Sequence, residues 1–462
     1  MKKESLTTNT ILLMIGTICN KGLQFLMIPL FSAWLDTASY GNFDVYCTYI
    51  SLLTPIVTLS IQEGVFRFSV ESEQIKEKKV FISNGFIVCT FGLAIVSGIL
   101  LTVSFMYNAD NIFPFLLYFV SEIFSIYLRG VLRALKRLDI YSYSAPIVSG
   151  CIFIATYFLV YKSNMQLSGI LLGYGIGTLI GDMIICVAIK FARLISVKYV
   201  NLTTIKQLIM YSVPLIPNDI SWWVINASDR KIINIFLGAE ANGIYALSYK
   251  MPNICAAIFG VFSLSWQQEA IAIINSKERE VRFSKIFNKM LLLLLTICTL
   301  ITASNFVFFN YIFDKRYYAG INYVPLLIAA VMLTSISQYL GGIQISMKKP
   351  KENGITTVFG AISNILIHLL LVRAVGLWAA VISTVIANAI VVLLRWSRIK
   401  KDISFKLERN IYLLLMVYLL SVIMSFLNLV LSWRWIIFIC FMIALVVINY
   451  KEILKIVKER KI

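Results

Sequence analysis

Residues 229–250 read DRKIINIFLGAEANGIYALSYK, a charged triplet followed by an apolar run and a G-x-Y segment. Within this stretch, LGAEANGIYAL (237–247) aligns with LDTASYGNFDV (35–45), which places Gly243 opposite Gly41 at an offset of 202 residues. Each segment follows the first apolar stretch of its half of the chain. Internal similarity of this kind indicates a duplicated architecture, so we expect the two halves to share one fold.

Two further matches occur in the same order along the chain. YLRGVLRALKR (127–137) aligns with YLGGIQISMKK (339–349) at an offset of 212. Small or polar residues spaced four apart then recur at an offset of 207: Gly169, Gly173, Gly177 and Gly181, then Gly376, Ala380, Thr384 and Asn388. Such spacing gives a small-residue helix face suited to close packing. The repeat predicts two six-helix halves of the same orientation, followed by two additional helices.

The composition is that of an integral membrane protein. Of the 462 residues, 59% are hydrophobic and 14% are charged, whereas a soluble domain carries roughly a quarter charged residues. Apolar stretches long enough to cross a ~30 Å hydrocarbon core recur throughout the chain. The first follows Lys2 and Lys3, but it is too long for a signal peptide and lacks a small-residue cleavage site. We therefore expect it to be a retained helix.

These patterns predict an all-α integral membrane protein with about 14 transmembrane helices. The predicted spans are 9–33, 42–66, 80–106, 113–132, 142–161, 167–190, 207–237, 244–268, 286–313, 321–347, 354–372, 376–396, 411–431 and 433–450. The expected domains are an N-terminal six-helix lobe (1–200), a C-terminal six-helix lobe (201–400), and two additional helices with a basic cytoplasmic tail (401–462).

The charge distribution predicts the topology. A net charge of +19 could indicate nucleic-acid binding, but the basic residues fall in short loops between apolar stretches, and topology explains them better. With both chain ends in the cytoplasm, 31 of the 42 lysines and arginines lie in cytoplasmic segments and five in external ones, as the positive-inside rule requires. The eight cysteines lie singly in apolar stretches without metal-type spacing, which is typical of small core residues.

Polar side chains also occur inside the predicted spans, where an ionisable group costs at least ~2.5 kcal/mol unless it faces a cavity or a partner. One face of the seventh span carries Asp219, Trp223, Asn226 and Arg230. Two interpretations stay open. This stripe lines a cavity, or it joins neighbouring helices, with Asp219 or Asp229 neutralising Arg230 or the adjacent lysine.

The first span has a similar polar face. Thr17, Asn20 and Gln24 lie on one side of it, and Lys21 adjoins them near the middle of the span. Because snorkelling to either surface is hardest at that depth, Lys21 is the leading candidate for an anion-binding residue.

Twelve helices in two halves plus two more, with a G-x-Y segment after the seventh, resemble the multidrug/oligosaccharidyl-lipid/polysaccharide exporter superfamily. Within it, the chain is most similar to Wzx-type polysaccharide flippases. The resemblance covers nearly the whole chain and rests on residues 229–250 and on their first-half counterpart, which runs through Gly41, Phe43, Gly64 and Arg67. It implies a MATE-like fold with a central cavity between the two lobes, lined chiefly by the first, second, seventh and eighth helices.

The resemblance also implies a function. An oligosaccharide repeat unit, linked to a lipid of the undecaprenyl-diphosphate type, would be flipped to the external leaflet by alternating access for O-antigen, lipopolysaccharide or capsule synthesis. The implied setting is the bacterial inner membrane, with membrane lipids, a polysaccharide polymerase and chain-length proteins as candidate partners. No catalytic residue, metal, cofactor or nucleic acid is expected.

The candidate binding residues follow from the chemistry of that cargo, since lysine and arginine bind a diphosphate through charge-assisted hydrogen bonds. Those for diphosphate and sugar are Lys21, Asn20, Gln24, Arg67, Asn226, Arg230, Lys250 and Asn253. For Lys250, snorkelling stays open as an alternative, and for Arg67 and Arg129, anchoring of a helix end. Glu63 is the expected partner of Arg67. The candidates for a coupling proton or sodium ion are Asp219, Asp229 and Asp182.

Other function classes fit the sequence less well. A membrane polymerase or glycosyltransferase usually needs a substantial external loop, whereas the predicted external loops have about a dozen residues or fewer. No G-x-x-x-x-G-K-[ST] or H-E-x-x-H motif occurs. The main alternative is a cation-coupled multidrug or solute exporter of the same superfamily, which the excess of cations in the cavity helices disfavours. The single histidine, His368, is expected to be a hydrogen-bonded structural residue.

Overall fold

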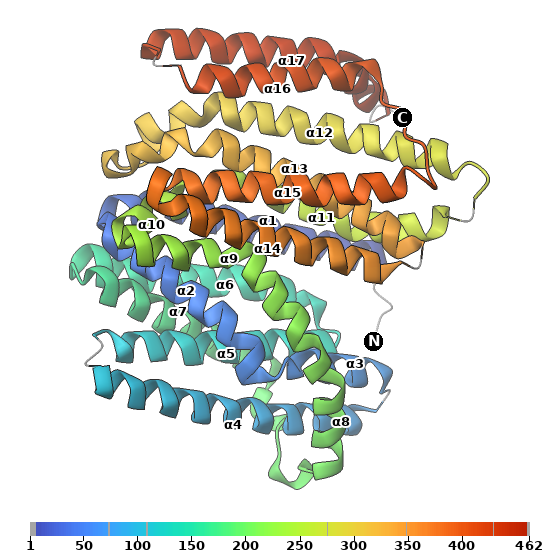
Figure 1. Cartoon of the computed structure of the whole chain (residues 1–462). Helices are drawn as coiled ribbons and strands as arrows, with labels where there is room; N and C mark the ends of the chain where they lie inside the picture. The colour runs from blue at the N-terminus through green and yellow to red at the C-terminus, as the bar shows by residue number, and fades with distance from the viewer. Residues whose placement is uncertain are drawn as a thin grey trace. The chain divides into compact units, whose positions relative to one another are not determined.

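The computed structural model describes residues 6–72, 74–107, 110–274, 276–347, 349–427 and 429–459, and the regular elements in these ranges are helices (Figure 1). The first eight α-helices are α1 (Leu6–Trp34), α2 (Thr37–Thr58), α3 (Ile61–Glu71), α4 (Ile75–Tyr107), α5 (Ile112–Ala134), α6 (Leu138–Thr156), α7 (Gln166–Ile189) and α8 (Leu202–Ser212). They are followed by α9 (Ile216–Leu237), α10 (Ala239–Ser248), α11 (Lys250–Ile273), α12 (Arg279–Val307), α13 (Val324–Ser346), α14 (Pro350–Val375), α15 (Trp378–Ile399), α16 (Arg409–Ser425) and α17 (Leu431–Glu459).

Each predicted span coincides with one of these helices or with two consecutive ones. By length and composition, nine spans in the described ranges could cross a membrane, and the bent pair α2 and α3 makes a tenth. α9 is not among them because it carries four charged side chains, Asp219, Asp229, Arg230 and Lys231. The chain is an all-α integral membrane protein, as predicted.

The predicted span 42–66 is broken in the structure. α2 and α3 meet at an angle of 54°, and the two residues between them, Leu59 and Ser60, are both left-handed, with φ of 51° and 49°. A left-handed residue other than glycine costs roughly 1–2 kcal/mol. Pro55 lies one turn earlier and removes one intrahelical hydrogen bond. Thr58 stabilises the break by accepting a hydrogen bond from the Ser60 amide at 3.1 Å.

The predicted span 207–237 is divided as well. α8 ends at Ser212, a 3₁₀ turn η4 (Val213–Leu215) follows, and α9 begins at Ile216. Pro214 and Pro217 account for this break, because neither can donate a backbone hydrogen bond. α8 stands at a steep angle to α4 (Figure 1) and packs against α3 and α4.

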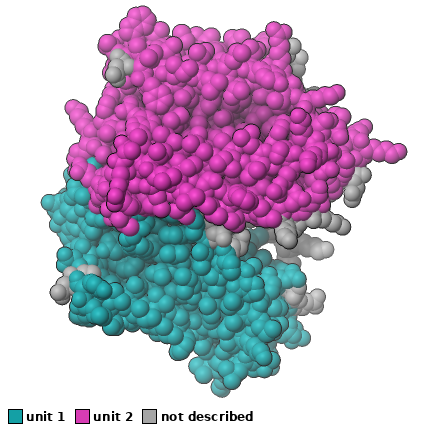
Figure 2. All heavy atoms as spheres, in the orientation of Figure 1, with its two compact units in different colours: residues 1–231 teal, residues 232–462 magenta. Residues whose placement is uncertain are grey.

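The chain forms two compact units, residues 1–231 and residues 232–462 (Figure 2). In unit 1, α7 packs closely against α5 and α6. A Cβ atom added at Gly177 would lie 2.4 Å from the Cα of Ile152, and one at Gly181 would lie 2.8 Å from the Cα of Val148. The predicted small-residue face of this helix is therefore confirmed. The lobe boundaries at residues 200 and 400 stay a prediction.

In unit 2, α13 packs against α11, α12 and α15. One cluster of its core joins the end of α9 to α10, α13 and α15 through Ile233, Tyr245, Leu327, Leu377, Ala380 and Val381. α16 and α17 pack on α12. Only 6% of the most apolar window of residues 431–450 is buried, and the Asn449 amide of α17 donates to the Thr296 hydroxyl of α12 at 3.2 Å.

Candidate functional site

The polar stripe of α9 lies against α2 and the break that follows it. The Trp223 indole donates to the backbone oxygen of Thr48 at 2.8 Å. Further toward the end of α9, the Arg230 Nε lies 2.7 Å from the Asp44 Oδ2. From Asp44 to Thr48 the residue number rises along α2, while that of the partner falls from Arg230 to Trp223 along α9. The two helices therefore run antiparallel here.

Toward the start of α9, the stripe contacts the break itself. The Ser60 hydroxyl donates to the Asp219 carboxylate at 2.9 Å. Asp219 and Arg230 are eleven positions apart and therefore point in nearly the same direction at 100° per residue. The fourth predicted member of the stripe, Asn226, lies on α9, but its side chain is outside those that the structure describes.

Asp44, which the sequence analysis did not single out, supplies a carboxylate to Arg230. The side chain of Arg230 is 15% exposed and that of Asp44 is 14% exposed. The neighbouring ammonium of Lys231 forms a hydrogen bond with the Tyr49 hydroxyl of α2 and lies 4.9 Å from the centre of its ring. Acidic residues near the end of a span are usually assigned to the interface, and this is why Asp44 was missed.

Most of the remaining cavity candidates lie on α1 and α11. Asn20 of α1 accepts a hydrogen bond from the Ser149 hydroxyl of α6 at 2.7 Å, while Lys21 and Gln24 are exposed. In unit 2, Lys250 is half-buried at the start of α11, and Asn253 is exposed one turn further on.

Arg67 is exposed near the end of α3. Its expected partner Glu63 forms an ion pair with Arg133 of α5 at 3.2 Å, and the pairing of Glu63 with Arg67 stays a prediction. The guanidinium of Arg133 also lies over the ring of Phe66, 4.1 Å from its centre. Glu63 therefore ties α3 to α5.

Asp182 of α7 and three residues of α5 form a polar network in unit 1, in which Asp182 and Ser125 are buried and Glu122 and Arg129 are partly exposed. Asp182 is 2% exposed, and its Oδ1 accepts a hydrogen bond from the Ser125 hydroxyl at 3.1 Å. Its Oδ2 has no hydrogen-bond partner among the described residues. Ser125 in turn accepts from Arg129 at 2.9 Å, and Arg129 pairs with Glu122 at 3.2 Å. Arg129 is thus part of a network, in addition to lying near a helix end.

Of the other two coupling candidates, Asp219 accepts the hydrogen bond from Ser60 described above, and Asp229 is buried on α9 with 5% exposure. His368 is fully buried in α14. One turn earlier on the same helix, the Asn364 amide donates to the Thr384 hydroxyl at 3.4 Å. Across the described ranges, no three histidine, cysteine, aspartate or glutamate side chains gather as a metal site would require.

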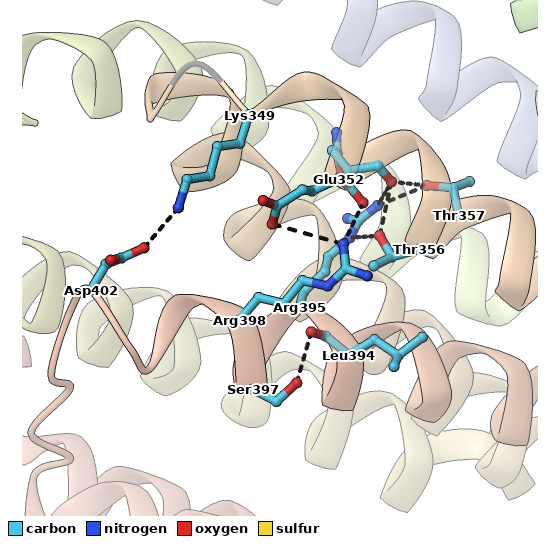
Figure 3. Close-up of polar contacts among 10 residues, drawn as sticks. Lys349, Glu352, Thr356, Thr357, Leu394, Arg395, Ser397, Arg398 and Asp402 are labelled. Carbon is cyan, nitrogen blue, oxygen red and sulfur yellow. Dashed lines mark hydrogen bonds and ion pairs between the residues drawn. The ribbon is translucent and has the colours of Figure 1, made fainter.

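A second polar cluster, in unit 2, was not predicted from the sequence. The guanidinium of Arg395 on α15 is 6% exposed and points at Thr356 and Thr357 of α14 (Figure 3). It donates to their hydroxyls at 3.0 and 2.8 Å. It also donates to the backbone oxygen of Ser337 on α13 at 2.5 Å and to that of Asn353 at 3.3 Å. Arg395 therefore holds three helices together.

Ion pairs flank this cluster (Figure 3). Glu352 lies 3.8 Å from Arg398. Lys349, in the segment between α13 and α14, donates to Asp402 at 3.0 Å, and this hydrogen bond raises the pKa of the Lys349 ammonium. Both pairs are substantially exposed, so they contribute little to stability compared with Arg395.

A multi-pass helical bundle with charged residues inside its spans places the chain in the class of polytopic membrane proteins. Residues 6–267, more than half of the chain, match the model of a family described as polysaccharide biosynthesis protein. The chain belongs to this family, and with it to the multidrug/oligosaccharidyl-lipid/polysaccharide exporter superfamily.

The chain is also similar to individual known proteins. An uncharacterized membrane protein of Methanocaldococcus jannaschii is 24% identical over 437 residues, which cover 86% of this chain and 100% of that protein. Two solved structures share the fold with a TM-score of 0.65 each. One is a multidrug resistance MATE family transporter in an inward-facing conformation, at 12% identity over 82% of this chain and 95% of that one. The other is the lipid II flippase MurJ in an inward closed conformation, at 15% identity over 97% of this chain and 100% of that one.

Proposed function

We propose that this protein is a Wzx-type flippase. It moves a polyprenyl-diphosphate-linked oligosaccharide repeat unit from the cytoplasmic to the external leaflet, for the assembly of a surface polysaccharide such as O-antigen or capsule. The headgroup enters a polar cavity while the polyprenyl tail stays in the lipid, and alternating access then exposes the headgroup on the other side. The family match and the MurJ-like and MATE-like fold support transport rather than catalysis.

The observation that carries this proposal is the pair of adjacent cations on α9. Arg230 is paired with the carboxylate of Asp44, whereas Lys231 is bound to the neutral hydroxyl of Tyr49. Among the described residues, no carboxylate lies within ion-pairing distance of Lys231. An ammonium inside a membrane span costs about 2.5–3.5 kcal/mol when no anion is paired with it, so Lys231 favours an anionic cargo.

Further contacts of the cargo are assigned by exposure and chemistry. Lys21 and Gln24 are exposed on α1, and Lys250 and Asn253 lie on α11. We assign the diphosphate to lysine and arginine side chains, and the sugar to the amides, which donate and accept hydrogen bonds. Asn20 is a weaker candidate because Ser149 already uses its oxygen.

For the driving force we propose proton or sodium coupling through Asp182, with Asp219 and Asp229 as further candidates. In the network of Asp182, two carboxylates share one guanidinium, so the fully ionised state carries a net negative charge in a buried place. Binding one proton or cation at Asp182 removes that charge. The unpartnered Oδ2 atom of Asp182 is where it would bind.

The proposed location is a bacterial inner membrane with both termini in the cytoplasm, which the distribution of basic residues supports. The undecaprenyl-type carrier and the surrounding lipids are the direct partners. A polysaccharide polymerase and chain-length proteins would act on the repeat unit after its transfer.

The test is transfer of lipid-linked oligosaccharide in sealed inverted vesicles from cells with and without this protein, scored by protection of the headgroup. Wild-type protein should give protection, and Lys21→Ala and Arg230→Ala should abolish it while folding and membrane insertion are unchanged. The matched control is Lys162→Ala, which removes an exposed cation at the end of the η1 turn (Tyr157–Lys162). Wild-type transfer in the Lys21 and Arg230 variants would remove these residues from the site.

A cation-coupled multidrug or solute exporter is the second candidate, favoured by the MATE-like fold. It predicts efflux of organic cations that depends on buried carboxylates such as Asp182. Absence of transfer for every lipid-linked sugar, together with such efflux, would decide for this candidate.

A further inference from the structure

Two consecutive cations of α9 are both held by side chains of α2. The Arg230 guanidinium lies 2.7 Å from the Asp44 carboxylate, and the Lys231 ammonium is bound to the Tyr49 hydroxyl. Because the ion pair keeps about 15% of its exposure, it is enclosed but still reachable. α2 thus presents one carboxylate and one phenol to two positive charges.

The partners on α2 do not match the two cations in charge. Asp44 is paired with Arg230, but the Tyr49 hydroxyl bound to Lys231 is uncharged. A single carboxylate has two acceptor atoms, whereas a diphosphate carries at least two negative charges and several oxygen acceptors. A diphosphate would therefore neutralise both cations of α9 at once, which α2 does not.

We infer that Arg230 and Lys231 form an anion-exchange site, at which the diphosphate of the cargo displaces the carboxylate of Asp44. This inference rests on the proposed function and adds Asp44, Lys231 and Tyr49 to its site. The exchange is geometrically simple because the planar guanidinium binds carboxylate and phosphate in the same forked arrangement. In the absence of cargo, Asp44 is an internal competitor that keeps Arg230 occupied.

The exchange also separates helices. It removes the contacts of Arg230 and Lys231 with α2, and leaves those of Trp223 with Thr48 and of Asp219 with the break. A ligand shifts a conformational equilibrium only through a difference in its affinity for the two states. Here the cargo binds the state in which Asp44 has left Arg230. Cargo binding therefore loosens α2 from α9 and favours rearrangement only when the site is filled.

The test is binding of inorganic pyrophosphate to the full-length protein in lipid nanodiscs, measured by calorimetry with sulfate as the comparison anion. Asp44→Asn removes the competing charge and should raise the pyrophosphate affinity about tenfold, while Arg230→Gln should abolish binding. The matched control is Asp36→Asn, which removes a carboxylate from the N-cap of the same helix and should leave the affinity unchanged. A folded Asp44→Asn variant with wild-type or weaker affinity overturns the inference.

A second measurement follows the helix contact itself. Saturating pyrophosphate should increase amide hydrogen exchange in α2 of the wild-type protein, because Asp44 loses its partner, and should not do so in Arg230→Gln. The charge-reversed pair Asp44→Arg with Arg230→Asp restores an ion pair, so it should protect α2 as wild type does and fail to bind pyrophosphate. Wild-type binding by this double variant would show that the pair is not an exchange site.

The vesicle assay separates this inference from the proposed function. If pyrophosphate acts as expected but no lipid-linked sugar is moved, the exchange site stands and the cargo is wrongly assigned. If cargo is moved and Asp44→Asn has wild-type pyrophosphate affinity, the function stands and the exchange is refuted.

Discussion

Replacing Arg395 with methionine should destabilise unit 2 without touching any residue of the proposed cargo site. Methionine has a similar length but no donor, so four hydrogen bonds to α13 and α14 are lost. Hydrogen bonds from a charged group contribute about 1.5–3 kcal/mol each, while burying the guanidinium costs several kcal/mol. The acceptors keep partners in their own helices, since the hydroxyls of Thr356 and Thr357 also donate to the Asn353 oxygen. We expect a net loss of about 3 kcal/mol.

Gly341 on α13 allows this reasoning to be checked independently. A Cβ atom at Gly341 would lie 2.8 Å from the Arg395 Nη1 and 2.9 Å from the Asn353 Oδ1. Alanine gains about 1 kcal/mol of helix propensity there, but overpacking costs about 1–3 kcal/mol. Gly341→Ala should therefore destabilise the protein while Arg395 is present. In the Arg395→Met background the contact with the guanidinium is removed and only that with Asn353 remains, so the same change should destabilise the protein less.

The assay is thermal unfolding in detergent, followed by loss of the monodisperse peak in fluorescence-detected size-exclusion chromatography. Arg395→Met should lower the midpoint by about 5–10 °C. Gly354→Ala on α14 is the matched control, because a Cβ atom there meets no atom within 4 Å. Unchanged unfolding of Arg395→Met would refute the reasoning. So would a Gly341→Ala effect of equal size in both backgrounds, because it would show that the two residues do not interact.

Three further changes test other parts of the molecule. Gly177→Ala should reduce the yield of folded protein, since its Cβ would lie 2.4 Å from backbone atoms of α6, whereas Gly150→Ala meets open space; equal yields in size-exclusion profiles would contradict this. Asp182→Asn keeps the shape of the side chain but removes the charge, so transfer in vesicles should lose its dependence on an imposed proton or sodium gradient; a retained dependence would exclude Asp182 from coupling. Lys349→Gln should leave the unfolding midpoint unchanged because its ion pair is exposed, and a clear drop would mean that this pair is coupled to its buried neighbours.

Hydropathy was sufficient to locate the helices, because the length of an apolar run is set by the thickness of the bilayer. It did not locate the breaks equally well. The break between α8 and α9 had a sequence signal in Pro214 and Pro217. The break after α2 falls on Leu59 and Ser60, neither of which disfavours a helix strongly. The left-handed geometry of these two residues has no signal in their own residue types.

Side-chain partners were harder to predict than helices. The face of α9 was visible in the spacing of Asp219, Trp223 and Arg230, but the helix opposite it was not. Asp44 lies on another helix, and no periodicity relates it to Arg230. Arg395 was missed for a different reason. Two of its four acceptors are backbone oxygens, which every residue has and which leave no mark in a sequence.

The loose burial of α17 has a practical consequence for handling the protein. In a bilayer, lipid covers the exposed side of this helix and holds it at its depth, so few protein contacts are needed to keep it in place. A small or harsh detergent replaces that lipid with a mobile shell, and the Asn449 bond and the packing of α17 on α12 and α16 then carry the attachment alone. Preparations extracted with mild, long-chain detergents, or directly into polymer-bounded lipid discs, should keep α17 docked. In preparations made with harsh detergents, we expect α17 to detach and to become sensitive to proteases first.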